Sequence, residues 1–190
     1  IHEGTVSLAA TPQKDWLDQY YSRCRELAQQ QSELTQECAQ TVNLLREDGS
    51  SASILLAVED IEADMGSVTG WLQESSVTEL TQSVQTDILE SLRQLIEATQ
   101  QEMQEMKEHE HEQQQNQNSQ EKPGLVKLMA EIRMLRTLQL QVNRRTKQLD
   151  GLMQSVTTEE QPALRKQLHE LAVRQQRLIV TAKELAKQAE

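Results

Sequence analysis

The stretch "LRKQLHELAVRQQRLIVTAKELAKQA", residues 164–189, decides the fold class of this chain. Its apolar and small residues recur at alternating steps of four and three, which is the spacing of a coiled-coil seam. A long amphipathic helix is therefore expected here, and Pro162 suits its first turn. The seam positions are Leu164, Leu168, Leu171, Gln175, Leu178, Ala182, Leu185 and Ala189.

Similar spacing predicts the other helices. One is expected over about 12–47, where Thr11 and Pro12 resemble a helix start and Gly49 a helix stop. The chain has no Phe and only 2 % aromatic residues, so aliphatic seams between long helices must supply the core. We therefore expect an all-α protein, an elongated antiparallel helical bundle or coiled coil of about five helices.

Charge divides the chain into two arms. Residues 1–121 carry a net charge of −17 and residues 122–190 a net charge of +6, within a total of −11. Opposite charges favour pairing of such arms over wrong pairings. The expected organisation is an N-terminal extended segment (1–11), an acidic arm of three helices (12–111), a Gln-rich connector (112–123) and a basic helical hairpin (124–190).

The second predicted helix, which Ser50 or Ser51 can cap, contains two glycines. Gly66 and Gly70 either weaken its later part or form a small patch that lets another helix approach closely. Local weakness is the favoured interpretation, because a glycine inside a helix ordinarily costs stability.

The segment "EKPGLVKLMAEIRMLRTLQLQVNRRTKQLDG", residues 121–151, is basic in an acidic chain. We expect its helix to pack antiparallel on the acidic helix before the connector, or to bind the acidic surface of a protein partner. The acidic helix offers Glu90, Glu97, Glu102 and Glu105. The candidate partner-binding residues are Arg133, Arg136, Gln139, Asn143, Arg144, Arg145 and Lys147.

Other reactive side chains have plain explanations. His109 and His111 are two apart on a helix and point in different directions, so a shared metal is not favoured. Cys24 and Cys38, ~21 Å apart on one helix, cannot bond each other. They are either small seam residues or sites of disulfides to a second chain. No phosphate loop or catalytic constellation is found, so neither an enzyme nor a cofactor is expected.

Two further expectations concern the membrane and the start of the chain. No apolar run approaches ~20 residues, so no transmembrane helix is expected. The chain begins with Ile1, and a removed signal peptide would explain this start. The rival function is binding of nucleic acid or an anionic surface through the basic helix 124–150.

Residues 84–150 also carry a resemblance. A helix that ends in a Gln-rich tract leads into the pattern L-V-x-x-x-A-E-x-x-M-x-R-x-x-Q-x-x-V-N-x-R-T. In this arrangement the chain resembles a family of helical, Gln-rich coiled-coil envelope proteins of planctomycete-type bacteria. The matching residues are Leu125, Val126, Ala130, Glu131, Met134, Arg136, Gln139, Val142, Asn143, Arg145 and Thr146.

The resemblance implies a location outside the inner membrane, periplasmic or envelope-associated. It also implies a structural or adaptor role beside a Tol/Exb-type proton-channel transport complex, because such transporters are often encoded beside members of that family. That membrane complex is one expected partner. Copies of the chain itself are the other, and this expectation comes from the heptad runs at 17–45 and 164–189.

Overall fold

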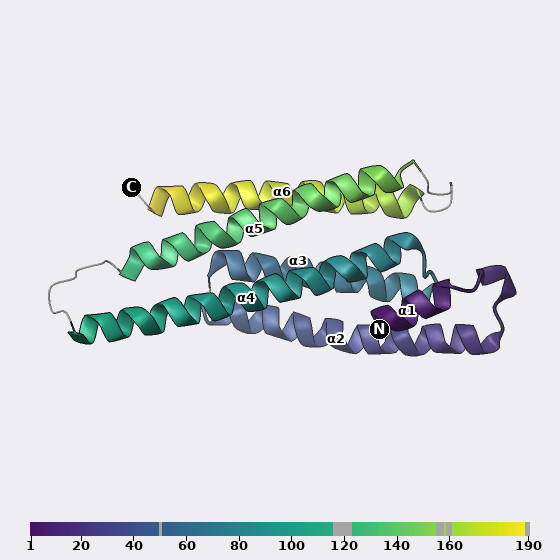
Figure 1. Ribbon diagram of the computed structural model, residues 1–190. Helices are drawn as coiled ribbons and strands as arrows, with labels where there is room; N and C mark the ends of the chain where they lie inside the picture. Colours follow the sequence, from purple (N-terminus) through teal and green to yellow (C-terminus); the bar gives the residue numbers. More distant parts are fainter. Residues whose placement is uncertain (50, 116–122, 155–157, 159–160, 189–190) are drawn as a thin grey trace. The chain divides into compact units, whose positions relative to one another are not determined.

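The computed structural model describes residues 1–49, 51–115, 123–154, 158 and 161–188. In these ranges every regular element is helical, which confirms the predicted all-α helical bundle (Figure 1). Six α-helices lie there, one more than expected. The order is α1 (His2–Ala9), the 3₁₀ helix η1 (Gln13–Asp15), α2 (Asp18–Glu47), α3 (Ala52–Gln73), α4 (Glu79–Gln115), α5 (Pro123–Leu152) and α6 (Gln161–Gln188).

The chain divides into two compact units. The N-terminal unit combines Ile1–Ser50 with Leu55–Ser91, and the C-terminal unit combines Ser51–Ile54 with Leu92–Glu190. The division falls inside α4 rather than at the Gln-rich connector. The second half of α4 thus belongs to the same unit as the basic hairpin, because its side chains contact α5. Of the connector, residues 116–122 lie outside the described residues.

Helix α1 is the additional helix, and the expectation of an extended segment over 1–11 is wrong for it. Thr5 is fully buried and accepts a hydrogen bond from Gln85 at 3.0 Å. A Cβ atom at Gly4 would come 3.0 Å from a methyl group of Leu27, so α1 lies close against α2. An eight-residue helix is marginal by itself. These contacts from distant parts of the sequence stabilise it.

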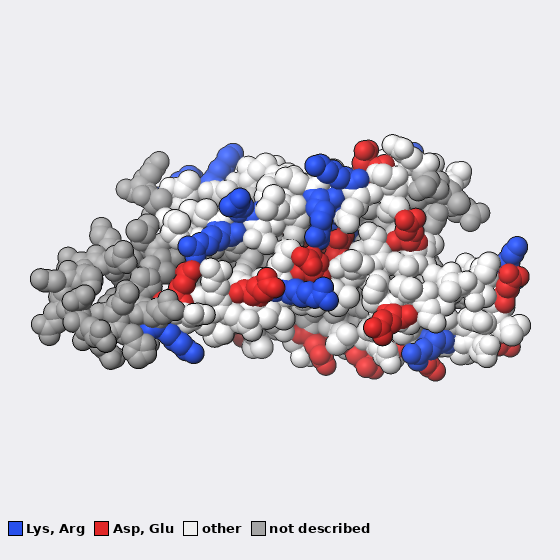
Figure 2. Space-filling model, viewed as in Figure 1, with Lys and Arg blue, Asp and Glu red and all other residues white. Residues whose placement is uncertain are grey.

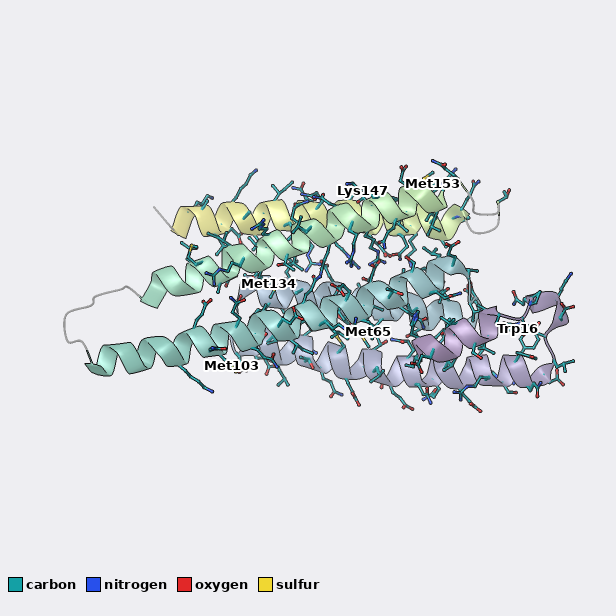
Figure 3. All side chains as sticks on the ribbon, viewed as in Figure 1. Trp16, Met65, Met103, Met134, Lys147 and Met153 are labelled. Carbon is teal, nitrogen blue, oxygen red and sulfur yellow. The ribbon has the colours of Figure 1, made fainter. Side chains whose placement is uncertain are left out.

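The helix expected from residue 12 begins instead at Asp18. Trp16 has an extended backbone, with φ −71° and ψ 133°, and separates η1 from α2. Its indole N–H donates to the carbonyl of Thr11 at 2.9 Å, and its ring stacks on Tyr20 at 6.0 Å between centroids. The buried Trp16 therefore packs at the N-terminal end of α2 (Figure 3). This packing breaks the helix that was predicted to run from residue 12.

Helices α2 and α3 run antiparallel in the N-terminal unit. The thiol of Cys24, early in α2, donates to the carbonyl of Leu72, late in α3, at 3.4 Å. At the other end Arg46 pairs with Glu59 at 2.7 Å. The tight connection between the helices contains Gly49, whose φ of +64° suits glycine as the predicted helix stop.

The start of α3 also follows the prediction. The Ser51 hydroxyl accepts the backbone N–H of Ile54 at 3.4 Å, which is the geometry of a side-chain cap on the first turn. Of the two serines proposed as caps, Ser50 lies outside the described residues.

Helices α5 and α6 form an antiparallel hairpin in the C-terminal unit (Figure 1). The predicted seam of α6 is used inside the chain, since its leucines at seven-residue intervals are all buried. They are Leu164, Leu171, Leu178 and Leu185, and α5 contributes the buried Met134, Leu138, Val142 and Leu149. This heptad therefore no longer argues for self-association, because its apolar row is already covered.

The two glycines of α3 have open surroundings, since nothing lies within 4 Å of a Cβ built at Gly66 or Gly70. No other helix therefore packs closely against these glycines, and the structure supports the interpretation that they weaken α3 locally. We expect Gly66→Ala to raise the free energy of unfolding by about 0.5–1 kcal/mol, because alanine lowers the entropy cost of the helix. Urea denaturation followed by far-ultraviolet circular dichroism measures this change.

The matched control is Gly49→Ala. It adds the same methyl group at a left-handed backbone conformation, so it should lower the free energy of unfolding by about 1 kcal/mol. A loss of stability in Gly66→Ala would contradict the open surroundings of α3.

Candidate protein-binding surface

The seven α5 residues predicted to bind a partner do not share one surface. Arg136, Asn143, Arg144 and Lys147 are exposed, Gln139 is half-buried and Arg145 is buried. The side chain of Arg133 is 55 % exposed and forms an ion pair. Figure 3 labels the exposed Lys147 and the buried Met134 of the same helix. The exposed subset is what a partner can reach.

Arg133 joins α5 to the second half of α4. Its Nη1 lies 2.7 and 3.0 Å from the two carboxylate oxygens of Glu105, one of the acidic residues expected to pair with α5. About 12 Å further along α5, Gln141 donates to Gln94 at 2.6 Å. From Arg133 to Gln141 the residue number rises along α5, while that of the partner on α4 falls from Glu105 to Gln94. The predicted antiparallel packing across the connector is therefore confirmed within the C-terminal unit.

Arg145 is a correction to the predicted surface. It is only 5 % exposed, and its guanidinium donates to the side-chain oxygen of Gln167 on α6. It follows Val142 by three residues and precedes Leu149 by four, so it falls on the buried row of α5. Its position in that row, more than its charge, decides that it faces the interior and not a partner.

Gln139 is also used inside the hairpin. Its amide donates to Gln175 at 2.7 Å and accepts from the Gln175 amide at 2.8 Å. The pair satisfies two polar groups between the helices. Because only opposed amides can exchange hydrogen bonds in this way, the pair also favours one register of α5 against α6.

A cavity of about 410 Å³, lined by both polar and apolar side chains, lies between the second half of α4, α5 and the first turn of α3. Its charged lining residues are Glu97, Glu105, Arg133 and Arg144. Among these, Arg133 and Glu105 already pair with each other. Between α4 and α5, long polar side chains take part in lining this cavity. Between α5 and α6, by contrast, a row of buried leucines fills the space.

An apolar groove of about 390 Å³ lies between α5 and α6. Eight of its ten lining residues are apolar, and two of them, Ile132 and Ile179, are 48 % and 39 % exposed. Two of the predicted partner-binding residues, Arg136 and Gln139, also line it. The lining residues are Leu128, Ile132, Leu135, Arg136, Gln139, Leu178, Ile179, Ala182, Leu185 and Ala186.

Positive charge surrounds this hairpin. On the face shown in Figure 2, Lys and Arg side chains gather over α5. On α6, Lys183 and Lys187 are exposed and follow Ile179 at four-residue intervals, so they lie on the same side of the helix. An exposed apolar patch with polar or charged residues at its edge is typical of interaction sites.

Glu131 connects α5 to the start of α3. Glu131, Met134, Leu138 and Val142 follow one another at steps of three and four, so they share one side of α5, and all four are buried. The Glu131 carboxylate accepts the backbone N–H of Ser53 at 3.1 Å. Acidic groups are favoured at helix N-termini, where N–H groups lack partners within the helix. Glu131 thus ties the first turn of α3 into the C-terminal unit.

We expect Glu131→Ala to lower the free energy of unfolding by about 1–3 kcal/mol, because it leaves the buried N–H of Ser53 without its acceptor. Glu131→Gln keeps an acceptor and should lose less. Glu184→Ala, at an exposed position of α6, is the matched control and should change little. Equal losses for Glu131→Ala and Glu184→Ala in urea denaturation would contradict this role.

The remaining candidates do not form a site. His109 and His111 lie in α4, but their side chains lie outside the described residues. Among the described residues, no group of three or more His, Cys, Asp and Glu side chains could hold a metal ion. Within the same part of the chain, each helix is too short or too polar to cross a membrane.

Both cysteines have reduced thiols in the N-terminal unit. Cys24 is fully buried, so it cannot reach a second chain, and burial raises the pKa of its thiol. Cys38 is half-buried; burial, and then the negative charge of Glu62, raise the pKa of its thiol. Raised pKa values keep both thiols protonated and slow to react, which favours their role as seam residues.

We expect Cys24 to resist a maleimide reagent in the native chain and to react once urea unfolds it. Cys38 should react slowly, and faster as the pH rises, because more of its thiol then ionises. Mass spectrometry counts the labels, and Cys38→Ser should leave no native labelling. A disulfide-linked dimer on a non-reducing gel would contradict this expectation.

Comparisons with protein-family models, with curated proteins and with solved structures find no match for this chain. The resemblance to the envelope protein family therefore stays a prediction. Function must be argued from the surface of the C-terminal unit.

Part of that surface escaped the sequence reasoning. Three of the five groove residues on α6 belong to the predicted seam, whereas Ile179 and Ala186 lie outside it. A signal was present, since Val173, Ile179 and Val180 are apolar residues outside that seam, and all three are exposed. Apolar residues beyond those needed for one seam indicate a second apolar surface on the helix.

Proposed function

We propose that this chain is a non-enzymatic structural or adaptor protein that binds another protein through the exposed side of the α5–α6 hairpin. The observation that carries the proposal is the apolar groove beside Arg136, on a hairpin whose leucine row is already buried. Within the residues that the structure describes, Ile132 and Ile179 of this groove keep 48 % and 39 % of their surface exposed. An apolar patch bordered by polar groups is typical of protein interaction sites.

The finer parts of the proposal rest on the family resemblance. It supports a periplasmic or envelope-associated location and a role as an extracytoplasmic partner of a Tol/Exb-type proton-channel transport complex. A second copy of the chain is a further proposed partner, since α4 also exposes apolar side chains, namely Leu92, Ile96 and Met103.

The alternative function is binding of nucleic acid or an anionic surface through α5. The exposed Arg136, Arg144 and Lys147 favour it, because Lys and Arg supply most phosphate contacts. The net charge of −11 opposes it over longer distances. The protein-binding proposal is preferred because phosphate groups would contact only the basic side chains, whereas a protein partner would also bury the apolar groove.

Crosslinking in the native envelope tests the proposal. A photoreactive amino acid replaces Asn143 or Lys147, both exposed on α5, and adducts are identified by mass spectrometry. We expect defined protein adducts from these positions and weaker, non-specific ones from Arg25, an exposed control position on α2. Partner contacts should be confined to the surface that carries the groove.

Two outcomes would contradict the proposal. One is an equal pattern of adducts from α5 and from the control position. The other is salt-dependent binding to duplex DNA or anionic vesicles that Arg136→Glu and Lys147→Glu abolish, which would support the alternative function.

A further inference from the structure

The apolar groove is long enough to contact about three turns of a bound helix. Its α5 side extends from Leu128 to Gln139, which corresponds to ~17 Å along the helix axis, or about three turns. Ile132 and Ile179 stand on its two sides, and each is exposed by more than a third. Helices that bind in apolar grooves insert residues spaced by three, four and seven positions.

The border of the groove is basic. Arg136 lines the α5 side, and on the α6 side the exposed Lys183 follows the groove residue Ile179 by four positions and precedes the groove residue Ala186 by three. The acidic residues nearby do not offset them. Glu184 is two residues from both Ala182 and Ala186, so it points away from the groove, toward Lys187, which follows it by three positions. Glu131 is buried against the first turn of α3.

The exposed apolar face of α4 fits this border poorly. Arg93 precedes Ile96 by three residues and Lys107 follows Met103 by four, so both cations lie beside the apolar stripe. A second copy that placed this stripe in the groove would bring them toward Arg136 and Lys183. Like charges brought together at an interface favour a different partner.

We propose that the groove binds an acidic amphipathic helix of another protein. Its Leu or Ile residues at three-, four- and seven-residue spacing enter the groove, and its Asp and Glu residues face Arg136 and Lys183. This inference rests on the proposed adaptor function and names the chemistry of the partner. The basic residues select for an acidic helix, and the apolar floor supplies most of the binding energy.

The test uses the full chain and two fluorescent peptides that are designed as short helices. Both carry Leu in a heptad row, one with Glu and the other with Lys at the remaining positions. We expect the Glu peptide to bind in an anisotropy titration and the Lys peptide not to bind. Arg136→Glu with Lys183→Glu should weaken binding of the Glu peptide by at least about tenfold.

Two variants separate the groove from general charge effects. Ile179→Ser, which removes apolar surface from the groove and leaves the charges, should also weaken binding of the Glu peptide. Arg165→Glu makes the same charge change at an exposed position of α6 outside the groove and should leave binding nearly unchanged. Circular dichroism confirms that each variant is folded.

Several results would overturn the inference. They are no binding of the Glu peptide, equal binding of both peptides, equal loss in the Arg165→Glu control, or a dimer in light scattering that Arg136→Glu with Lys183→Glu dissociates. Binding of anionic vesicles that Ile179→Ser leaves unchanged would assign the charges to a lipid surface. If the Glu peptide fails while crosslinks from Asn143 or Lys147 to a protein persist, the adaptor function stands and only this inference falls.

Discussion

Four leucines, Leu164, Leu171, Leu178 and Leu185, recur every seven residues on α6, and the C-terminal unit depends on their burial. Each buried leucine contributes about 1.5–3 kcal/mol through removal of apolar surface from water. The chain has no Phe, so aliphatic rows of this kind must replace the aromatic bulk of an ordinary core. Because the row is used within the hairpin, the surface left for a partner is decided by what lies beside it.

Polar contacts add specificity to this apolar row. The reciprocal Gln139–Gln175 pair and the Arg145–Gln167 contact connect α5 to α6, while Glu131 connects α5 to the start of α3. A purely aliphatic seam tolerates shifts by one heptad, whereas opposed polar groups are satisfied in one register only. The groove keeps its shape because these contacts fix the two helices that line it.

The C-terminal unit therefore has two different sides around α5. Toward α4, the Arg133–Glu105 pair and a mixture of polar and apolar side chains surround a cavity. Toward α6, leucines pack closely and leave an apolar groove at one end. Exposed ion pairs contribute little to affinity or stability, so a protein partner gains more from the apolar side. This contrast is the physical reason for placing the proposed adaptor function at the α5–α6 groove.

The sequence by itself determined the all-α class, the stop at Gly49 and the cap at Ser51, because spacing, glycine and capping chemistry act over a few residues. The three-residue step from Glu131 to Met134 likewise puts both residues on one side of α5. Each of these depends on local physics that one helix or turn contains.

Only the tertiary structure decided the rest. Helix α1 needs Gln85 and Leu27, and the late start of α2 needs the packing of Trp16. Whether an arginine of α5 is buried or can contact a partner depends on the direction in which its side chain leaves the helix relative to the neighbouring helices. Arg145 is therefore buried, whereas Arg136 lines the groove. Charge can be read from a sequence, but the direction in which a charge points is settled by the helices that pack around it.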